Sequence, residues 1–177
     1  MASIVVVYHS GYGHTERVAQ FVADGAQGEL MPISAEGELS EADWARLDAA
    51  DAIVMGSPTY MGSVSWQFKK FADATSKRWF TSAWKDKLAG GFTVSANLSG
   101  DKLSTLQYFM TLAMQNGMIW VGQPLMNDGQ VNRLGSHSGV MAQVGPTQPA
   151  SDLPEGDLET ARRYGQRLRE MAERFKR

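Results

Sequence analysis

The sequence has 177 residues, of which 43% are hydrophobic and 20% charged, as is typical of one globular domain spanning residues 1–177. Its formal net charge of −2 excludes the strongly basic surface with which many proteins bind nucleic acid. The chain has no cysteine, which excludes disulfides, thiolate catalysis and cysteine-bound metals, and no metal site is expected.

Strands and helices alternate along the chain. The β-branched run Ile4–Tyr8 predicts a strand that is buried on both faces, as in a parallel sheet. The elements expected after it are, in chain order, a helix over 16–25, a strand over 29–33, a helix opened by a capping box of Ser40 and Asp43, a strand over 52–56, a helix over Trp66–Ala74, a strand over Leu88–Ser95, a helix over Lys102–Gln115, a strand over 118–121 and a helix over 158–175. This alternation predicts a parallel α/β sheet with helices on both faces.

The segment 124–154 interrupts the alternation. It contains four prolines and few periodic apolar runs, so we expect a long ordered loop with one short added strand over 140–144. Loops of this length inside a compact domain are usually functional.

The sequence shows no membrane or secretion signal. No apolar run approaches the roughly 20 residues that span a bilayer, and no basic segment precedes the short run at Ile4. We therefore expect a cytoplasmic protein without a membrane span.

A loop of small and polar residues follows the first strand. It consists of Ser10, Gly11, Tyr12, Gly13, His14 and Thr15. Its glycines let backbone amides approach a ligand, its hydroxyls add donors, and the next helix points its positive end at the same place. These features predict a phosphate cradle. The loop lacks the Gly-Lys-Ser/Thr of triphosphate hydrolases, and Glu16 stands where the dinucleotide fingerprint has its third glycine. Taken alone, the loop could also be a turn and a cap, with His14 a loop or cap residue rather than a base.

Small polar residues also follow the third and fourth strands, at the strand ends where open α/β sheets bind ligands. The first group is Pro58, Thr59, Tyr60, Met61 and Gly62, and the second is Ser95, Ala96, Asn97, Leu98 and Gly100. Pro58 fixes its φ angle and Gly62 lets the chain turn back. The first group alone could be a simple turn. Together they can form a flat slot for an isoalloxazine ring beside the phosphate cradle.

Two motifs in this order resemble a known family. One runs from Val5 to Thr15, and the other runs from Asp51 to Gly62 through Gly-Ser-Pro-Thr. They are similar to the phosphate loop and the third-strand signature of flavodoxin-fold NAD(P)H:quinone oxidoreductases. Within that group the resemblance is to the tryptophan repressor-binding protein (WrbA-type) family and the NADPH-dependent FMN reductases. It covers most of the chain and thins after Pro124.

The resemblance implies a flavodoxin-like, three-layer, doubly wound sandwich with a five-stranded parallel sheet of order 2-1-3-4-5. Residues 10–15 would hold the phosphate of flavin mononucleotide (FMN), and residues 58–62 and 95–100 would frame its ring. Trp79 and Asn116 would lie in the substrate pocket, where Asn116 replaces a histidine that the family often carries. No catalytic acid or base is expected, because the flavin carries the chemistry.

The leading hypothesis is an FMN-dependent oxidoreductase that passes a hydride from NADH or NADPH through FMN to a quinone or similar small acceptor. The alternatives are a flavodoxin-type electron carrier between protein partners and an FMN-binding regulatory or scaffold protein. The near-neutral charge is less typical of a carrier that docks by charge, which favours the enzyme. The resemblance also implies a homodimer or homotetramer, with Trp66, Phe80 and Trp84 as candidate interface residues.

Overall fold

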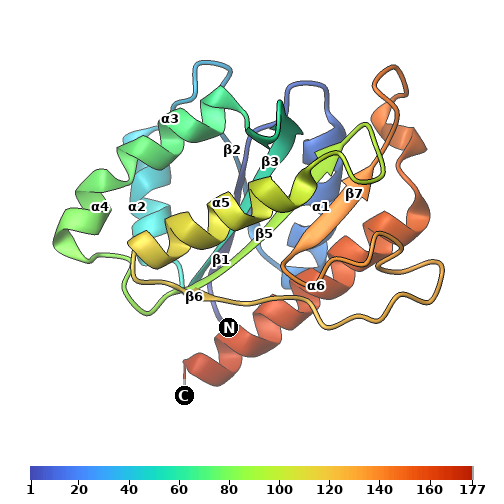
Figure 1. Ribbon diagram of the computed structural model, residues 1–177. Helices are drawn as coiled ribbons and strands as arrows, with labels where there is room; N and C mark the ends of the chain where they lie inside the picture. Colours follow the sequence, from blue (N-terminus) through green and yellow to red (C-terminus); the bar gives the residue numbers. More distant parts are fainter. Residues whose placement is uncertain (177) are drawn as a thin grey trace.

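A parallel sheet forms the middle layer of the computed structural model, which describes residues 1–176 (Figure 1). Its strands lie in the order β2-β1-β3-β5-β6. Their bounds are Glu29–Pro32 for β2, Ile4–Tyr8 for β1, Ala52–Tyr60 for β3, Leu88–Ser95 for β5 and Ile119–Trp120 for β6. Because β5 and β6 are the predicted fourth and fifth strands, the expected order 2-1-3-4-5 is confirmed.

Two further strands make the sheet seven-stranded rather than five-stranded. β4 (Ser63–Val64) pairs antiparallel with the end of β3, and β7 (Val140–Gln143) pairs in parallel with the second half of β5. β6 pairs with the first half of β5, so β6 and β7 share one edge of the sheet. The residues between them leave the sheet and return to it. The short strand expected in the segment 124–154 is therefore confirmed.

β3 is longer than the sequence predicts. The expected strand ended at Gly56, but Ser57 and Pro58 remain paired with β5. The next two residues, Thr59 and Tyr60, pair with β4. The turn at Gly62 is confirmed, but it closes a β-hairpin rather than a loop that starts at Ser57.

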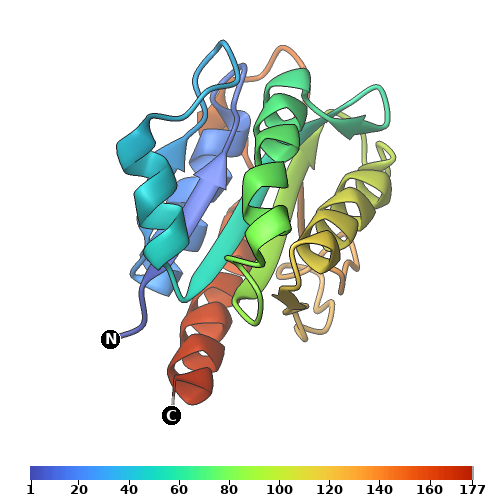
Figure 2. The ribbon, with the colours of Figure 1, turned by 90° about the vertical axis from the view of Figure 1, so that its left-hand side faces the viewer.

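Helices cover both faces of the sheet (Figures 1 and 2). They are α1 (His14–Ala26), α2 (Glu41–Ala49), α3 (Trp66–Ala74), α4 (Ser76–Thr81), α5 (Lys102–Gln115) and α6 (Glu155–Phe175), with a 3₁₀ turn η1 at Ala150–Asp152. α1 and α6 pack on one face, and α2, α3 and α5 pack on the other. The capping box of Ser40 and Asp43 is confirmed at the start of α2. α4 was not expected, because its six residues are too few to show a helical apolar period.

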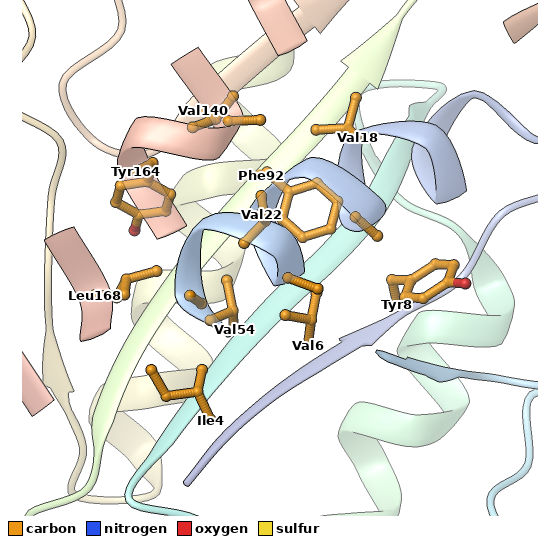
Figure 3. Packing of buried hydrophobic residues seen from close by; sticks show 14 of the residues in the cluster. Ile4, Val6, Tyr8, Val18, Val22, Val54, Phe92, Val140, Tyr164 and Leu168 are labelled. Carbon is orange, nitrogen blue, oxygen red and sulfur yellow. The ribbon is translucent and has the colours of Figure 1, made fainter. Parts of the chain in front are cut away.

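The side chains of β1 point alternately to the two faces of the sheet, and both faces are buried, which explains why its sequence is apolar throughout. Ile4, Val6 and Tyr8 point to the face covered by α1 and α6, where Phe92 of β5 and Val22 of α1 join them (Figure 3). Val5 and Val7 point to the opposite core. Both faces of the strand are thus buried, as the unbroken run predicts.

α1 and α6 touch through their backbones. A Cβ atom on Gly25 of α1 would lie 1.9 Å from the carbonyl oxygen of Arg162, and one on Gly165 of α6 would lie 2.1 Å from that of Val22. Only glycine fits at this crossing. The contact fixes the position of α1, whose first turn follows the phosphate loop.

Tyr164 of α6 connects this helix to the sheet. Its buried hydroxyl donates to the carbonyl of Val121 at 2.5 Å and accepts from the backbone N–H of Gly91 at 3.2 Å. Tyr164→Phe leaves both backbone groups without this partner, so we expect the free energy of unfolding to fall by about 2 kcal/mol. Thermal unfolding of the apoprotein would show this as a Tm lower by about 6 °C.

The control for this prediction is Tyr12→Phe, which removes a hydroxyl from a side chain that is 79% exposed. We expect its Tm to stay within about 1 °C of the wild type, because exposed hydroxyls are already solvated by water. An equal, small effect of both variants would contradict the role assigned to Tyr164.

No helix within residues 1–176 is both long enough and apolar enough to cross a membrane.

Candidate functional site

A cleft of about 330 Å³ opens at the carboxyl ends of β1, β3 and β5. The three predicted groups of residues meet there, together with residues that follow β7. The lining residues are Gly11, Tyr12, His14, Thr15, Pro58, Thr59, Tyr60, Val94, Ser95, Ala96, Val144 and Pro146. The strand ends that the sequence singled out thus converge on one cavity, whose volume is within the range of cofactor sites.

The phosphate loop is held by its own serine. The Ser10 hydroxyl oxygen accepts from the backbone N–H groups of Gly13, at 3.1 Å, and Glu16, at 3.2 Å. Its hydrogen remains available to donate. Gly13 has a φ of 85° and is the N-cap of α1, so the N–H groups of His14 and Thr15 lie in the first turn, where a helix has no internal acceptors for them. Ser10 and Gly13 do not themselves line the cleft but shape the loop that does.

His14 ties the start of α1 to the segment after β7. Its Nε2 lies 2.7 Å from the carbonyl oxygen of Gln148. Because a carbonyl can only accept, Nε2 carries the hydrogen. This bond connects the cradle to the segment that brings Val144 and Pro146 to the cleft. Sequence reasoning missed these two residues, since neither has a chemical signal and only the pairing of β7 with β5 places them there.

The β3–β4 hairpin forms the second wall. Met61 and Gly62 both have positive φ angles, 46° and 80°, as a two-residue hairpin turn requires. They project beyond the cleft and do not line it. Below them, Thr59 Oγ1 lies 2.8 Å from the hydroxyl oxygens of both Thr93 and Thr105, which fixes its side chain against the sheet.

Tyr60 of this hairpin packs toward the phosphate loop. A Cβ on Gly11 would lie 2.8 Å from the Tyr60 hydroxyl, so glycine leaves room for the ring. Burial raises the pKa of the Tyr60 hydroxyl, and the nearby Tyr12 raises it further. The phenol therefore remains neutral at physiological pH and offers a flat face rather than a charge.

Ser95 and Ala96 form the third wall, and the rest of that loop supports them. Gly100 has a φ of 52°, and a Cβ on it would lie 2.0 Å from the Ser95 hydroxyl. Asn97 and Leu98 lie in the same turn but do not line the cleft. Behind the wall is Lys102, a fully buried residue that sequence reasoning missed, because a lysine in the first turn of a helix is usually exposed.

Trp79 and Asn116 lie away from the cleft, so their predicted place in the substrate pocket is wrong within one chain. α5 runs back from the carboxyl ends of the strands (Figure 1), and Asn116 is the residue that caps its far end. There it is buried, and its side-chain amide donates to the Thr75 hydroxyl at 3.3 Å. Trp79 lies on α4, the helix that follows Thr75.

The expected interface tryptophan Trp84 is a core residue. It is 1% exposed, stacks near Trp44 and donates from its indole nitrogen to Asp48 at 2.7 Å. It is therefore not available to contact a second chain. Trp66 and Phe80, by contrast, are 62% and 82% exposed.

Comparison with known proteins identifies the family. The family model described as NADPH-dependent FMN reductase matches residues 41–132. The chain belongs to this family. Among its relatives, the chain is 50% identical over 175 residues to flavodoxin FldP of Pseudomonas aeruginosa, with 95% of each chain covered. It is 32% identical over 151 residues to an NAD(P)H dehydrogenase (quinone) of Azorhizobium caulinodans, with 75% of this chain and 76% of that protein covered.

A solved structure agrees with this assignment. The flavodoxin, WrbA-like protein from Agrobacterium tumefaciens is 53% identical, with a TM-score of 0.84 over 99% of both chains. The predicted family, the flavodoxin-like fold, the oxidoreductase class and FMN as cofactor are therefore confirmed.

The residues of the cleft also fit an FMN molecule. The first turn of α1 and the Thr15 hydroxyl supply donors for a phosphate without any lysine, and Ser10 holds the loop that carries them. Gly11 leaves open the space that a Cβ would fill beside Tyr60. The cleft between the hairpin and the Ser95 wall, lined by Pro58, Tyr60 and Ala96, can accept a planar ring.

Proposed function

We propose that this protein transfers electrons from NADH or NADPH to a quinone or similar small acceptor through FMN bound in the cleft. The observation that carries the proposal is the convergence of the phosphate loop, the β3–β4 hairpin and the Ser95 wall on one cavity. Bound FMN supplies the redox chemistry, because its ring can accept a hydride and pass on two electrons.

In this proposal the chain binds and orients the cofactor. The N-terminal turn of α1 and the Thr15 hydroxyl hold the phosphate, and Ser10 holds the loop that carries them. The residues 58–60 and 95–96 flank the ring and set which of its edges is open to a second molecule. Tyr60 and Tyr12 line the end near the phosphate loop. No side chain is assigned as acid or base, since the lining holds no carboxylate, lysine or arginine and its histidine, His14, is bonded to the Gln148 carbonyl.

The quinone acceptor and the nicotinamide donor are supported by the relatives. Several are named NAD(P)H dehydrogenase (quinone), including one from Archaeoglobus fulgidus that is 32% identical over 199 residues. We also propose a homodimer or homotetramer, with the exposed Trp66 and Phe80 as contact residues. Light scattering of the purified protein measures its mass and decides this point.

A second function is a flavodoxin-type carrier that exchanges electrons with protein partners. The observation in its favour is the relative at 50% identity, which is named a flavodoxin. Both functions use the same FMN site, and they differ in whether NADH or NADPH reduces the flavin directly.

Anaerobic mixing of the FMN-loaded protein with NADPH or NADH separates the two functions. For the oxidoreductase we expect the flavin absorbance to bleach about 100-fold faster than that of free FMN, because binding holds donor and flavin together. Adding a benzoquinone should then restore the absorbance. Free FMN and the protein mixed with NADP⁺ are the controls.

The carrier function predicts a different result. With either nicotinamide the bound flavin would bleach no faster than free FMN, and only a partner reductase would reduce it, one electron at a time. That outcome would contradict the oxidoreductase proposal.

A further inference from the structure

A buried lysine supports the third wall of the cleft. Lys102 is fully buried, and its Nζ donates to the Ser95 hydroxyl oxygen and to the Asn97 carbonyl oxygen, each at 2.7 Å. The Ser95 hydroxyl also donates to the Asn97 carbonyl at 3.1 Å. The ammonium thus ties Ser95, which lines the cleft, to Asn97 in the same turn.

Asp157, the carboxylate whose charge acts on Lys102, is already paired with another residue. Asp157 of α6 is buried and receives both Nε and Nη2 of Arg133 at 2.8 Å, and the backbone N–H of Gln143 at 3.0 Å. No carboxylate within residues 1–176 forms a salt bridge with Lys102. Lys102, Arg133 and Asp157 therefore leave one uncompensated positive charge behind the Ser95 wall.

An uncompensated buried cation is unfavourable unless something else offsets it. Burial lowers the pKa of Lys102 to about 8; the charge of Asp157 partly offsets this lowering, and the charge of Arg133 adds to it. Because this pKa lies above 7, the amine still carries its proton at pH 7. Its two contacts are neutral oxygen atoms of the turn that begins at the cleft wall. Because Ser95 both lines the cleft and contacts the ammonium, an anionic group in the cleft can interact with this charge across one side chain.

We propose that Lys102 is a positioning residue that shapes the Ser95 wall for FMN and, through its positive charge, favours the reduced form of the cofactor. The inference rests on the proposed binding of FMN in this cleft. Reduction adds negative charge to the flavin ring, and a cation near the ring stabilises that charge. Arg133 and Asp157 pair with each other, so Asp157 does not neutralise the charge on Lys102.

Four variants test the proposal. Lys102→Met removes charge and donors, Lys102→Gln removes the charge but keeps a donor, and Lys102→Arg keeps the charge. The matched control is Lys69→Met on α3, because Lys69 is an exposed lysine whose only salt bridge within residues 1–176 is to Asp73 on its own helix. For each variant, the dissociation constant of FMN from the apoprotein and the midpoint potential of bound FMN are measured, together with the Tm.

We expect Lys102→Met and Lys102→Gln to weaken binding of reduced FMN about tenfold more than binding of oxidised FMN. That ratio lowers the two-electron midpoint potential by about 30 mV. Lys102→Arg should keep the potential of the wild type, and Lys69→Met should change neither quantity.

A folded Lys102→Gln variant with the potential of the wild type would overturn the proposal, even if its FMN affinity were lower. Lys102→Gln decides the question if Lys102→Met does not fold. Failure of the wild-type apoprotein to bind FMN is a separate result that needs no variant, and it would overturn the proposed function instead.

Discussion

Replacing Gly165 with alanine is expected to lower the free energy of unfolding by about 3 kcal/mol, because overpacking at a rigid contact costs this much. The new Cβ would lie 2.1 Å from the carbonyl oxygen of Val22 and 2.8 Å from the backbone nitrogen of Ala26. Both atoms belong to the backbone of α1 and cannot move aside by a rotamer change. The two helices must separate, and urea unfolding of the apoprotein would measure the loss.

The sign of this effect is informative. In an isolated helix alanine is favoured over glycine by about 1 kcal/mol, so helix propensity alone predicts that Gly165→Ala stabilises the protein. The control is Glu170→Ala on the exposed side of α6, which should change stability by less than about 0.5 kcal/mol. A Gly165→Ala variant as stable as the wild type would show that the helices do not touch at this point.

Ser10→Asp is expected to reduce FMN affinity about a thousandfold while preserving the fold. The carboxylate can accept from Gly13 and Glu16 as the serine does, because aspartate is a good helix-capping acceptor. Its charge, however, would stand beside the phosphate. Two like charges about 4 Å apart repel by about 4 kcal/mol near a protein surface, which is about a thousandfold in affinity.

Titration of the apoprotein with FMN and with riboflavin separates charge from shape. Riboflavin has no phosphate, so Ser10→Asp should weaken its binding far less than that of FMN. Ser10→Asn is the matched control, since it keeps an acceptor oxygen without the charge. We expect its FMN affinity to fall by about tenfold or less. Equal losses for FMN and riboflavin in Ser10→Asp would place the phosphate elsewhere.

The parts of the site that were predicted from sequence are those with local signals at strand ends. Ser10, Thr59 and Ser95 each lie at or just beyond the end of an apolar strand. Parallel strands bring their carboxyl ends to the same end of the sheet, irrespective of the helices that connect them. Three separated segments could therefore be assigned to one cleft from the amino-acid sequence alone. The order of the parallel strands, by contrast, followed only from the family resemblance, because apolar runs do not indicate which strands are neighbours.

The parts that were missed depend on contacts between distant segments. Lys102 has the sequence context of a solvated residue, but its ammonium is buried against Ser95 and Asn97 and feels the charge of Asp157, which is 55 positions away. Val144 and Pro146 reach the cleft because β7 joins the sheet next to β5, which no local pattern indicates. Trp79 and Asn116 were misplaced because the helices that carry them run away from the cleft.

The division of one sheet edge between β6 and β7 has a consequence for solubility. Edge strands expose unpaired backbone groups that can recruit a strand from another molecule and start aggregation. Here that edge is made by strands of two and four residues, and the opposite edge is β2, which has four residues and ends at Pro32. Proline has no N–H to donate. Each edge therefore offers only a short template to a misfolded neighbour, which protects a chain that carries several exposed aromatic side chains.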